Sequence, residues 1–326
     1  MRTIKELSVK GLLLLFLFTV SLAGFSQTLK EAIDAYNEGA SLMKSDPEGA
    51  IKAFEKCVSI SEQLGEEGAE TRDKAADQLP TMYYTVAMNT YKTKDYSGAI
   101  KGFEKAAEVG DQYGNSQISS KANQIIPQLY NIEGSAFYKE ENYDAALNSF
   151  DQAIKKMPNY AKPYLGKALV YKNQEAYEDM LAACDKAIEV GMSTGDDNTT
   201  ESAEKLARNT MFNNAVMALE AKNWGEAEDG LKKSIMYGNS SPDTYFQLGR
   251  VYNAQEKWND AITNLNRGIE LDDGGTDTRA RYYYEMGNAY VGLGDTAAAC
   301  DAFKNAMYGQ YAENAKYQVE TVLKCN

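Results

Sequence analysis

A repeated pattern of aromatic and small residues runs through the chain from about residue 36, and no other feature restricts the fold as strongly. In each unit an aromatic residue is followed four positions later by Gly or Ala. A short polar break then leads into a second aromatic, an Ala three positions on, and an aromatic or Leu after four more. Residues 130–160 and 245–272 show the pattern in full, and residues 283–307 show it with Thr296 at the position of the second aromatic. This spacing places apolar residues on one helix face, so each unit predicts two amphipathic helices joined by a tight turn.

Small residues mark the points where the two helices of one unit are expected to cross. The expected contacts are Gly134 with Ala146, Gly249 with Ala261, and Gly287 with Ala299. A side chain larger than a methyl group would hold the helix axes apart there. The aromatic residues that follow the turns are interpreted as packing beneath them. They are Tyr143, Tyr177, Trp224 and Trp258.

These small and aromatic positions resemble those of the tetratricopeptide repeat family, whose unit is a helix–turn–helix of 34 residues. The closing proline of that family matches only at Pro158, and the resemblance covers about residues 36–325. It implies an all-α fold, a solenoid of antiparallel helix pairs. Some members of the family clamp a C-terminal carboxylate with Lys, Asn and Arg side chains on three consecutive repeats. Here only Asn131 and Lys162 are of a suitable type, and they do not complete such a clamp.

The intervals between equivalent second-helix positions depart from 34 residues, and the departures predict long helices. The positions are Ala50, Ala99, Ala146, Met180, Ala227, Ala261 and Ala299, at intervals of 49, 47, 34, 47, 34 and 38 residues. The three longest intervals contain residues 65–79, 110–126 and 191–207, each a glycine-bearing turn followed by a polar, helix-compatible stretch. We therefore expect first helices extended by about two to three turns. Pro80 and Pro127 should bend or interrupt them.

The complete prediction is an array of seven helix pairs over residues 27–326. The pairs are expected at roughly 29–64, 69–110, 116–157, 161–191, 199–237, 242–271 and 277–308. A final helix at about 311–325 should cap the last pair, because each repeat leaves one apolar face open.

Residues 1–26 have the pattern of a secretory signal peptide. Three basic residues precede an apolar run over residues 11–23, and small residues follow it. The run is shorter than the roughly 20 residues that a membrane-spanning helix needs, so a retained anchor is the less favoured alternative. We expect cleavage after Ala23 or Ser26. The product would be an exported protein, periplasmic or secreted, without a membrane span.

The composition argues against several kinds of chemistry. The chain has no histidine, which removes imidazole bases, histidine triads and histidine metal sites. Its formal charge of −13 argues against nucleic acid as a partner. The paired carboxylates at 66–67, 196–197 and 272–273 are interpreted as solvated loops or helix caps. Residues 272–278 lack the ligand alternation of a calcium loop. We therefore expect no enzyme activity, cofactor or metal.

The four cysteines divide into two kinds. Cys57 and Cys184 lie on core-facing stretches of distant repeats and are expected to be buried free thiols. Cys300 and Cys325 lie on the two arms of the last helical hairpin and form either a disulfide or two unpaired thiols. The arms differ by about seven residues, or about 10 Å of helix, whereas a disulfide needs Cα atoms within about 7 Å.

The predicted function is a protein-interaction scaffold or adaptor in the bacterial cell envelope that binds an apolar or aromatic partner segment on a concave helical face. The residues expected to contact the partner are Tyr36, Tyr84, Met88, Tyr91, Asn131, Tyr138, Lys162, Leu165, Phe212, Phe246, Arg250, Arg281 and Tyr284. The same face carries Met43, Leu169, Asn209, Val216 and Asn288. In an alternative interpretation, a tight superhelix or the protein's own extended helices cover these apolar residues. The 23 tyrosines also allow a glycan or small-ligand binder, and an enzyme is the third alternative.

Overall fold

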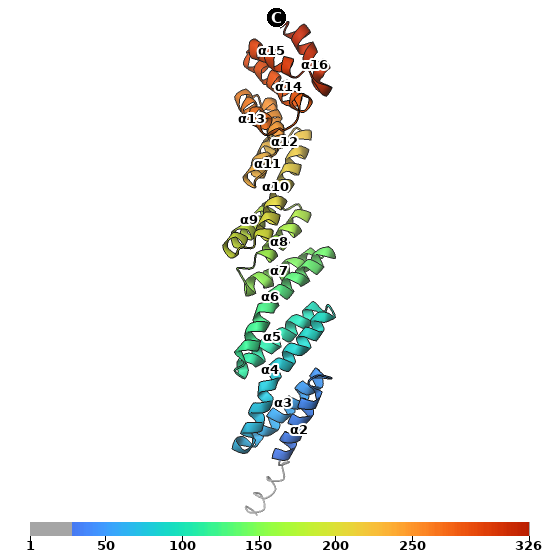
Figure 1. The fold of residues 1–326 in the computed structure, drawn as a ribbon, viewed down its shortest axis with the longest axis vertical. Helices are drawn as coiled ribbons and strands as arrows, with labels where there is room; N and C mark the ends of the chain where they lie inside the picture. Colours follow the sequence, from blue (N-terminus) through green and yellow to red (C-terminus); the bar gives the residue numbers. More distant parts are fainter. Residues whose placement is uncertain (1–27, 326) are drawn as a thin grey trace, which may run out of the picture. The chain divides into compact units, whose positions relative to one another are not determined.

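The computed structural model describes residues 28–325, so the predicted signal peptide and both predicted cleavage positions lie outside the described residues. All regular secondary structure within this range is helical, as the repeat pattern predicted. The chain divides into two compact units at Glu140, and Figure 1 labels the helices of each. Across residues 28–325, no helix has both the length and the apolar character of a membrane span.

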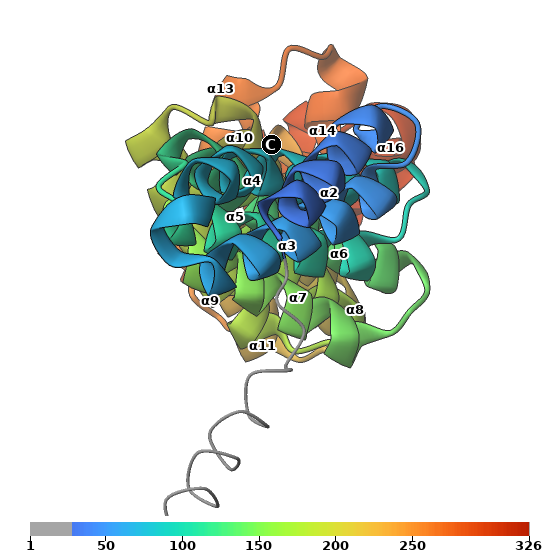
Figure 2. The same cartoon turned by 90° about the horizontal axis from the view of Figure 1, so that it is seen from below.

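The first unit, described over residues 28–140, is a stack of helices in chain order. Its helices are α2 (Leu29–Leu42), α3 (Pro47–Gln63), α4 (Ala69–Lys92), α5 (Tyr96–Gln112) and α6 (Ser116–Lys139), with a 3-10 turn η1 (Gly65–Gly68) before α4. Each helix contacts the next one along the chain. Helices α2, α3 and α4 lie side by side (Figure 2). The bounds agree with the predicted pairs 29–64 and 69–110.

The second unit, described over residues 141–325, repeats the same arrangement. Its elements are α7 (Tyr143–Lys156), α8 (Ala161–Asn173), α9 (Tyr177–Thr194), α10 (Asp197–Glu220), α11 (Trp224–Met236), α12 (Pro242–Ala254), α13 (Trp258–Leu271), α14 (Thr276–Leu293), α15 (Thr296–Asn305), η2 (Gly309–Tyr311), α16 (Ala312–Tyr317) and η3 (Gln318–Val322). Neighbours in sequence are again neighbours in space. The predicted consecutive helix pairing is confirmed in both units.

One residue in the left-handed backbone region closes the tight turn inside the helix pairs. Lys94, Glu175, Lys222 and Glu256 have φ values of 66°, 58°, 61° and 59°, and Gly294 has 77°. Each lies two residues before the first residue of the second helix of its pair. That first residue is the predicted aromatic at Tyr177, Trp224 and Trp258, and each of these side chains is half-buried. The aromatics therefore pack beneath the turns as expected.

The second-helix positions that define the repeat form the core. Ala50, Ala99, Ala146, Met180, Ala227, Ala261 and Ala299 are all fully buried. The side chains nearest to two of the crossing glycines lie one helical turn after the predicted partners Ala261 and Ala299. A Cβ atom on Gly249 would lie 2.6 Å from Leu265, and one on Gly287 would lie 2.6 Å from Phe303. Larger side chains one turn later fill the space that the glycines leave open. Gly134 and Ala146 belong to different units, so their contact stays a prediction.

The extended first helices are confirmed. Helices α4, α6 and α10 have 24 residues each, whereas α8 and α12 have 13. Pro80 and Pro127 lie inside α4 and α6, which continue through them, so the alternative of an interrupted helix is wrong. Both prolines are buried. Packing against the neighbouring helices holds each long helix together where the proline removes one backbone hydrogen bond.

The end of the chain differs from the predicted continuous helix at 311–325. Regular α-helix covers only Ala312–Tyr317, and a wider π turn follows over Gln318–Val322. The segment still covers the last pair, because Ala315 and Val319 pack with Phe303. Cys300 and Cys325 form a disulfide with a Cα–Cα distance of 5.8 Å. The irregular turns close the mismatch that two regular helices would have left.

The other two cysteines are buried free thiols, as predicted. Burial raises the pKa of Cys184 to about 12. Burial also raises the pKa of Cys57, whose Sγ lies 3.8 Å from the carbonyl oxygen of Thr71. A thiol is nucleophilic as its thiolate, so raised pKa values leave both groups unreactive at neutral pH.

Candidate functional site

In the first unit, the residues predicted to contact a partner are half-buried and pack on the core. The ring of Tyr36 lies 5.7 Å from that of Phe54, and the ring of Tyr84 lies 5.1 Å from that of Phe103 in an edge-to-face contact. Met88 and Tyr91 pack against the same cluster as Tyr84. Asn131 and Tyr138 on α6 are also half-buried. Part of each of these side chains therefore serves packing, and their contact with a partner stays a prediction.

In the second unit, the predicted residues separate into three groups. Leu165 lines a groove between α8 and α10, and Lys162 is exposed one turn before it on α8. Further along, Phe246 is 7% exposed, and the Arg250 and Arg281 guanidinium groups lie 5.9 Å and 4.6 Å from its ring centroid. Two other residues pack inward: Phe212 lies on a core cluster, and Tyr284 lies 5.5 Å from Phe303.

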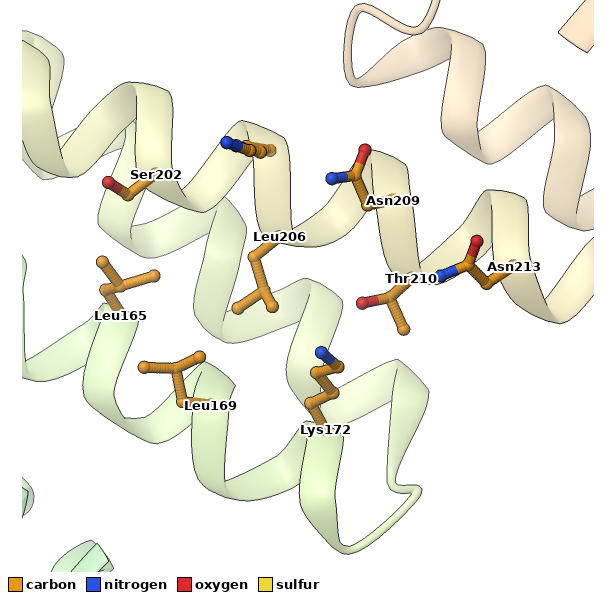
Figure 3. A pocket seen from close by; sticks show the side chains of 9 residues that line it. Leu165, Leu169, Lys172, Ser202, Leu206, Asn209, Thr210 and Asn213 are labelled. Carbon is orange, nitrogen blue, oxygen red and sulfur yellow. The ribbon is translucent and has the colours of Figure 1, made fainter. Parts of the chain in front are cut away.

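The groove between α8 and α10 has a volume of about 450 Å³ (Figure 3). Its lining comes from α8 with Leu165, Leu169 and Lys172, and from α10 with Ser202, Lys205, Leu206, Asn209, Thr210 and Asn213. Figure 3 shows Leu206 extending from α10 toward α8 and Lys172 extending from the end of α8 toward α10. Leu165 and Leu206 rest on the buried core cluster below. The floor is therefore apolar and anchored, while polar side chains border it.

The extra turns of α10 build one wall of this groove. Ser202, Lys205 and Leu206 belong to the additional segment 191–207 that lengthens the third long interval of the repeat. Its start is fixed by Asp196, whose carboxylate accepts hydrogen bonds from the backbone N–H and the hydroxyl of Thr199 at 3.2 and 2.7 Å. A helix of 13 residues that ended at Glu220 would begin at Arg208 and would not contain Ser202, Lys205 or Leu206.

The two lysines of the groove are electrostatically unpaired. Among residues 28–325, neither Lys172 nor Lys205 has an ion-pair partner, and no carboxylate lines the groove. Lys232 and Lys257 behave differently, because both bind Glu228. Partial burial alone would raise the pKa of Glu228, but hydrogen bonds from Lys232, Lys257 and Gln255 outweigh it and lower the pKa to about 2. Those ammonium charges are used within the fold, whereas the groove lysines are available to a ligand.

A second hollow, of about 470 Å³, lies beside α12 and α14 and is acidic. Asp243 and Asp272 line it together with Arg281. Arg281 donates a hydrogen bond to Asp243 at 3.0 Å, so part of its charge is already compensated. Asp272 is buried rather than solvated, and it accepts a hydrogen bond from the backbone N–H of Gly274 at 2.8 Å. This contact shapes the loop before α14, and within residues 28–325 no three Cys, Asp or Glu side chains gather as metal ligands.

Sequence reasoning found part of the groove and missed the rest. Leu165, Leu169 and Asn209 had been placed on the inner face, and all three line it. The residues it missed are Lys172, Ser202, Lys205, Leu206, Thr210 and Asn213. A signal was present, because Leu206, Asn209 and Asn213 follow one another at the three- and four-residue spacing of a single helix face.

Within each of the two units, helices packed against their neighbours in chain order define a helical-repeat protein. Comparison with known families agrees: residues 134–175 match a model described as TPR repeat, and residues 280–308 match a model described as tetratricopeptide repeat. The chain thus carries tetratricopeptide repeats in these two segments.

Three solved structures illustrate the likeness to known proteins. The protein MamA shares 18% identity at a TM-score of 0.34, covering 61% of this chain and 96% of its own. YrrB, described as a TPR protein with an unusual peptide-binding site, shares 17% at 0.33, covering 64% and 94%. A tetratricopeptide repeat protein from Parabacteroides merdae shares 14% at 0.30, covering 91% and 100%.

Proposed function

We propose that the protein is a non-enzymatic scaffold or adaptor that binds a segment of a partner protein on the inner faces of its first helices. The groove between α8 and α10 carries this proposal, because it offers an anchored apolar floor beside unpaired charges and exposed amides. Such a combination suits an extended chain, which presents side chains and backbone polar groups together. The tetratricopeptide fold supports the coarser statement that the partner is a protein.

Tyrosine packing favours a protein segment over a glycan as the ligand. Stacking on a sugar requires an aromatic face that is open to solvent. Tyr282 is fully buried, and the rings of Tyr36, Tyr84 and Tyr284 lie against core phenylalanines. These tyrosines therefore pack in or against the repeat core. The large number of tyrosines is thus a weaker argument for a glycan-binding site.

The proposed function is tested by site-specific crosslinking. A photo-crosslinking amino acid at Asn209 in the groove is compared with one at Glu189, an exposed position on the second helix α9. We expect an adduct with a particular protein from Asn209 and none from Glu189. The captured protein, purified, should bind the unmodified chain in calorimetry. Identical adducts from both positions, or a captured protein that fails to bind when purified, would contradict the proposal.

We also propose that the protein acts outside the cytoplasm, in the bacterial cell envelope. The basic, apolar and small segments of residues 1–26 support export. The Cys300–Cys325 disulfide supports it independently, because such bonds persist in oxidising compartments.

Export predicts a shortened mature protein. We expect intact-mass measurement of the native protein to show loss of residues 1–23 or 1–26, since cleavage is predicted after Ala23 or Ser26. Fractionation of the same cells should place the shortened species outside the cytoplasm. A full-length species that stays in the membrane fraction would support a retained anchor instead.

A further inference from the structure

We infer that the groove between α8 and α10 selects an extended partner segment in which aliphatic side chains are flanked by carboxylates. This inference rests on the proposed function and adds the chemistry of the segment to it. The ligand class follows from three properties of the lining: its length, its charge and its exposed hydrogen-bonding groups.

The apolar floor has the length of a few peptide residues. Leu165 and Lys172 are seven residues apart on α8, which is about 10 Å of helix. An extended chain advances about 3.3 Å per residue, so about three residues span that distance. Leu165, Leu169 and Leu206 line this length, and they offer contact to one or two aliphatic side chains. A short leucine-containing stretch fits this floor.

The charge at the groove is positive on an acidic chain. Lys172 stands at the end of α8, where its side chain extends toward Thr210 of α10 (Figure 3). Lys205 belongs to the lining on α10, between Ser202 and Leu206 in the sequence. The two ammonium groups therefore border different parts of the apolar floor. With a chain charge of −13, an acidic segment is repelled from most of the surface and attracted here. Carboxylates on both sides of the aliphatic residues complement this arrangement.

Exposed amides and hydroxyls favour a peptide over an acyl chain with a carboxylate head. Asn209 and Asn213 are exposed on the groove side of α10, and Ser202 lies beside them. An amide side chain both donates and accepts, as does a peptide backbone. An acyl chain would cover these groups without pairing them, which costs free energy. The groove therefore favours a ligand that has backbone polar groups of its own.

The combination of Lys205 and Leu206 on the groove side occurs in α10 and not in the other extended helices. Counting back from the equivalent second-helix alanines, the position of Lys205 is Asp77 in α4 and Gln124 in α6. The position of Leu206 is Gln78 in α4 and Ile125 in α6. Only α10 places a lysine beside a leucine there, so the selectivity belongs to this groove.

Calorimetry with short peptides tests the inference. The probe is an end-blocked peptide, Ser-Gly-Asp-Leu-Leu-Asp-Gly-Ser, and its control replaces both Asp by Asn. We expect saturable binding of the acidic probe and binding of the control weaker by about tenfold, from two lost exposed ion pairs. Raising the salt concentration from 50 to 500 mM should remove most of this difference. Equal binding of the two peptides, or stronger binding of the control, would overturn the inference.

Charge reversal locates the site. The double variant Lys172→Glu, Lys205→Glu should lose at least tenfold in affinity for the acidic probe. The matched variant Lys155→Glu, Lys316→Glu changes the chain charge equally at exposed positions outside the groove, and it should bind as the unmodified protein does. Leu206→Ala should weaken the binding of both peptides, because it removes apolar contact area from the groove and leaves its charge unchanged. Equal losses in the two charge variants would overturn the inference, as would tighter binding to phosphatidylglycerol vesicles than to the probe.

The captured partner separates this inference from the proposed function. If the groove-reversed variant still crosslinks the partner at full yield, the scaffold role stands and the acidic-segment inference is wrong. If the acidic probe binds in the groove but no protein partner is captured by the unmodified chain, the groove chemistry stands and the scaffold proposal is wrong.

Discussion

Replacing Cys300 and Cys325 together by Ala is expected to lower the free energy of unfolding of the second unit by about 3.5 kcal/mol. The disulfide joins residues separated by 25 positions. In the loop-closure description, a bond that closes a loop of this length removes that much conformational freedom from the unfolded chain. The bond also ties the segment after α16 to α15, where Val319 covers Phe303. Its loss should therefore act first on the last helix pair.

Tryptophan fluorescence makes this measurement specific to the second unit. The chain has two tryptophans, Trp224 and Trp258, and both begin helices of that unit. Urea denaturation followed by their fluorescence should shift to lower urea in the double variant. A reducing agent should shift the unmodified protein by the same amount and leave the variant unchanged. Four free thiols in denatured, unreduced protein, or equal stability of variant and unmodified protein, would show that the bond does not form.

The helix pairs could be predicted because the repeat encodes them locally. The aromatic at the start of a second helix, the alanine three residues on and the large residue one turn later fix the helix, its buried face and its partner within about 30 residues of sequence. Trp258, Ala261 and Leu265 are one such set, and the structure places Ala261 and Leu265 in the core. The lengthened intervals likewise predicted the long helices. The added residues are polar and helix-compatible, so they extend the first helix of the pair.

The groove could be predicted only in part because its walls come from helices that are not consecutive. Leu169 on α8 and Leu206 on α10 are separated by the whole of α9, and only the packing of the pairs brings them together. Leu206 also follows Glu204 and Lys205 and shares a helix face with Asn209 and Asn213, a pattern that is typical of an exposed face. Similarly, the stacking of Arg281 on Phe246 joins α14 to α12. Such contacts depend on the rotation of each helix pair relative to the next. The repeat pattern in the sequence does not specify this rotation.

Replacing Phe103 by Ala is expected to lower the free energy of unfolding of the first unit by about 3–5 kcal/mol, as for large-to-small changes in other cores. Phe103 is fully buried on α5 and lies one turn after Ala99. It packs with Ala87 of α4 and Ile126 of α6, so its removal leaves a cavity bordered by three helices. Phe103→Leu is the matched control, and a loss below about 1.5 kcal/mol is expected because most of the volume is kept.

Hydrogen exchange followed by mass spectrometry locates the Phe103 effect and clarifies the role of Tyr84. Backbone amides of α4 and α5 should lose protection in Phe103→Ala, whereas Phe103→Leu should keep most of it. Because the Tyr84 ring packs edge-to-face on Phe103, Tyr84→Ala should also reduce protection there, by a smaller amount. A partner-binding role for Tyr84 is therefore tested with Tyr84→Phe, which keeps the ring and removes only the hydroxyl. Unchanged exchange in Phe103→Ala would mean that this ring does not fill the core between α4, α5 and α6.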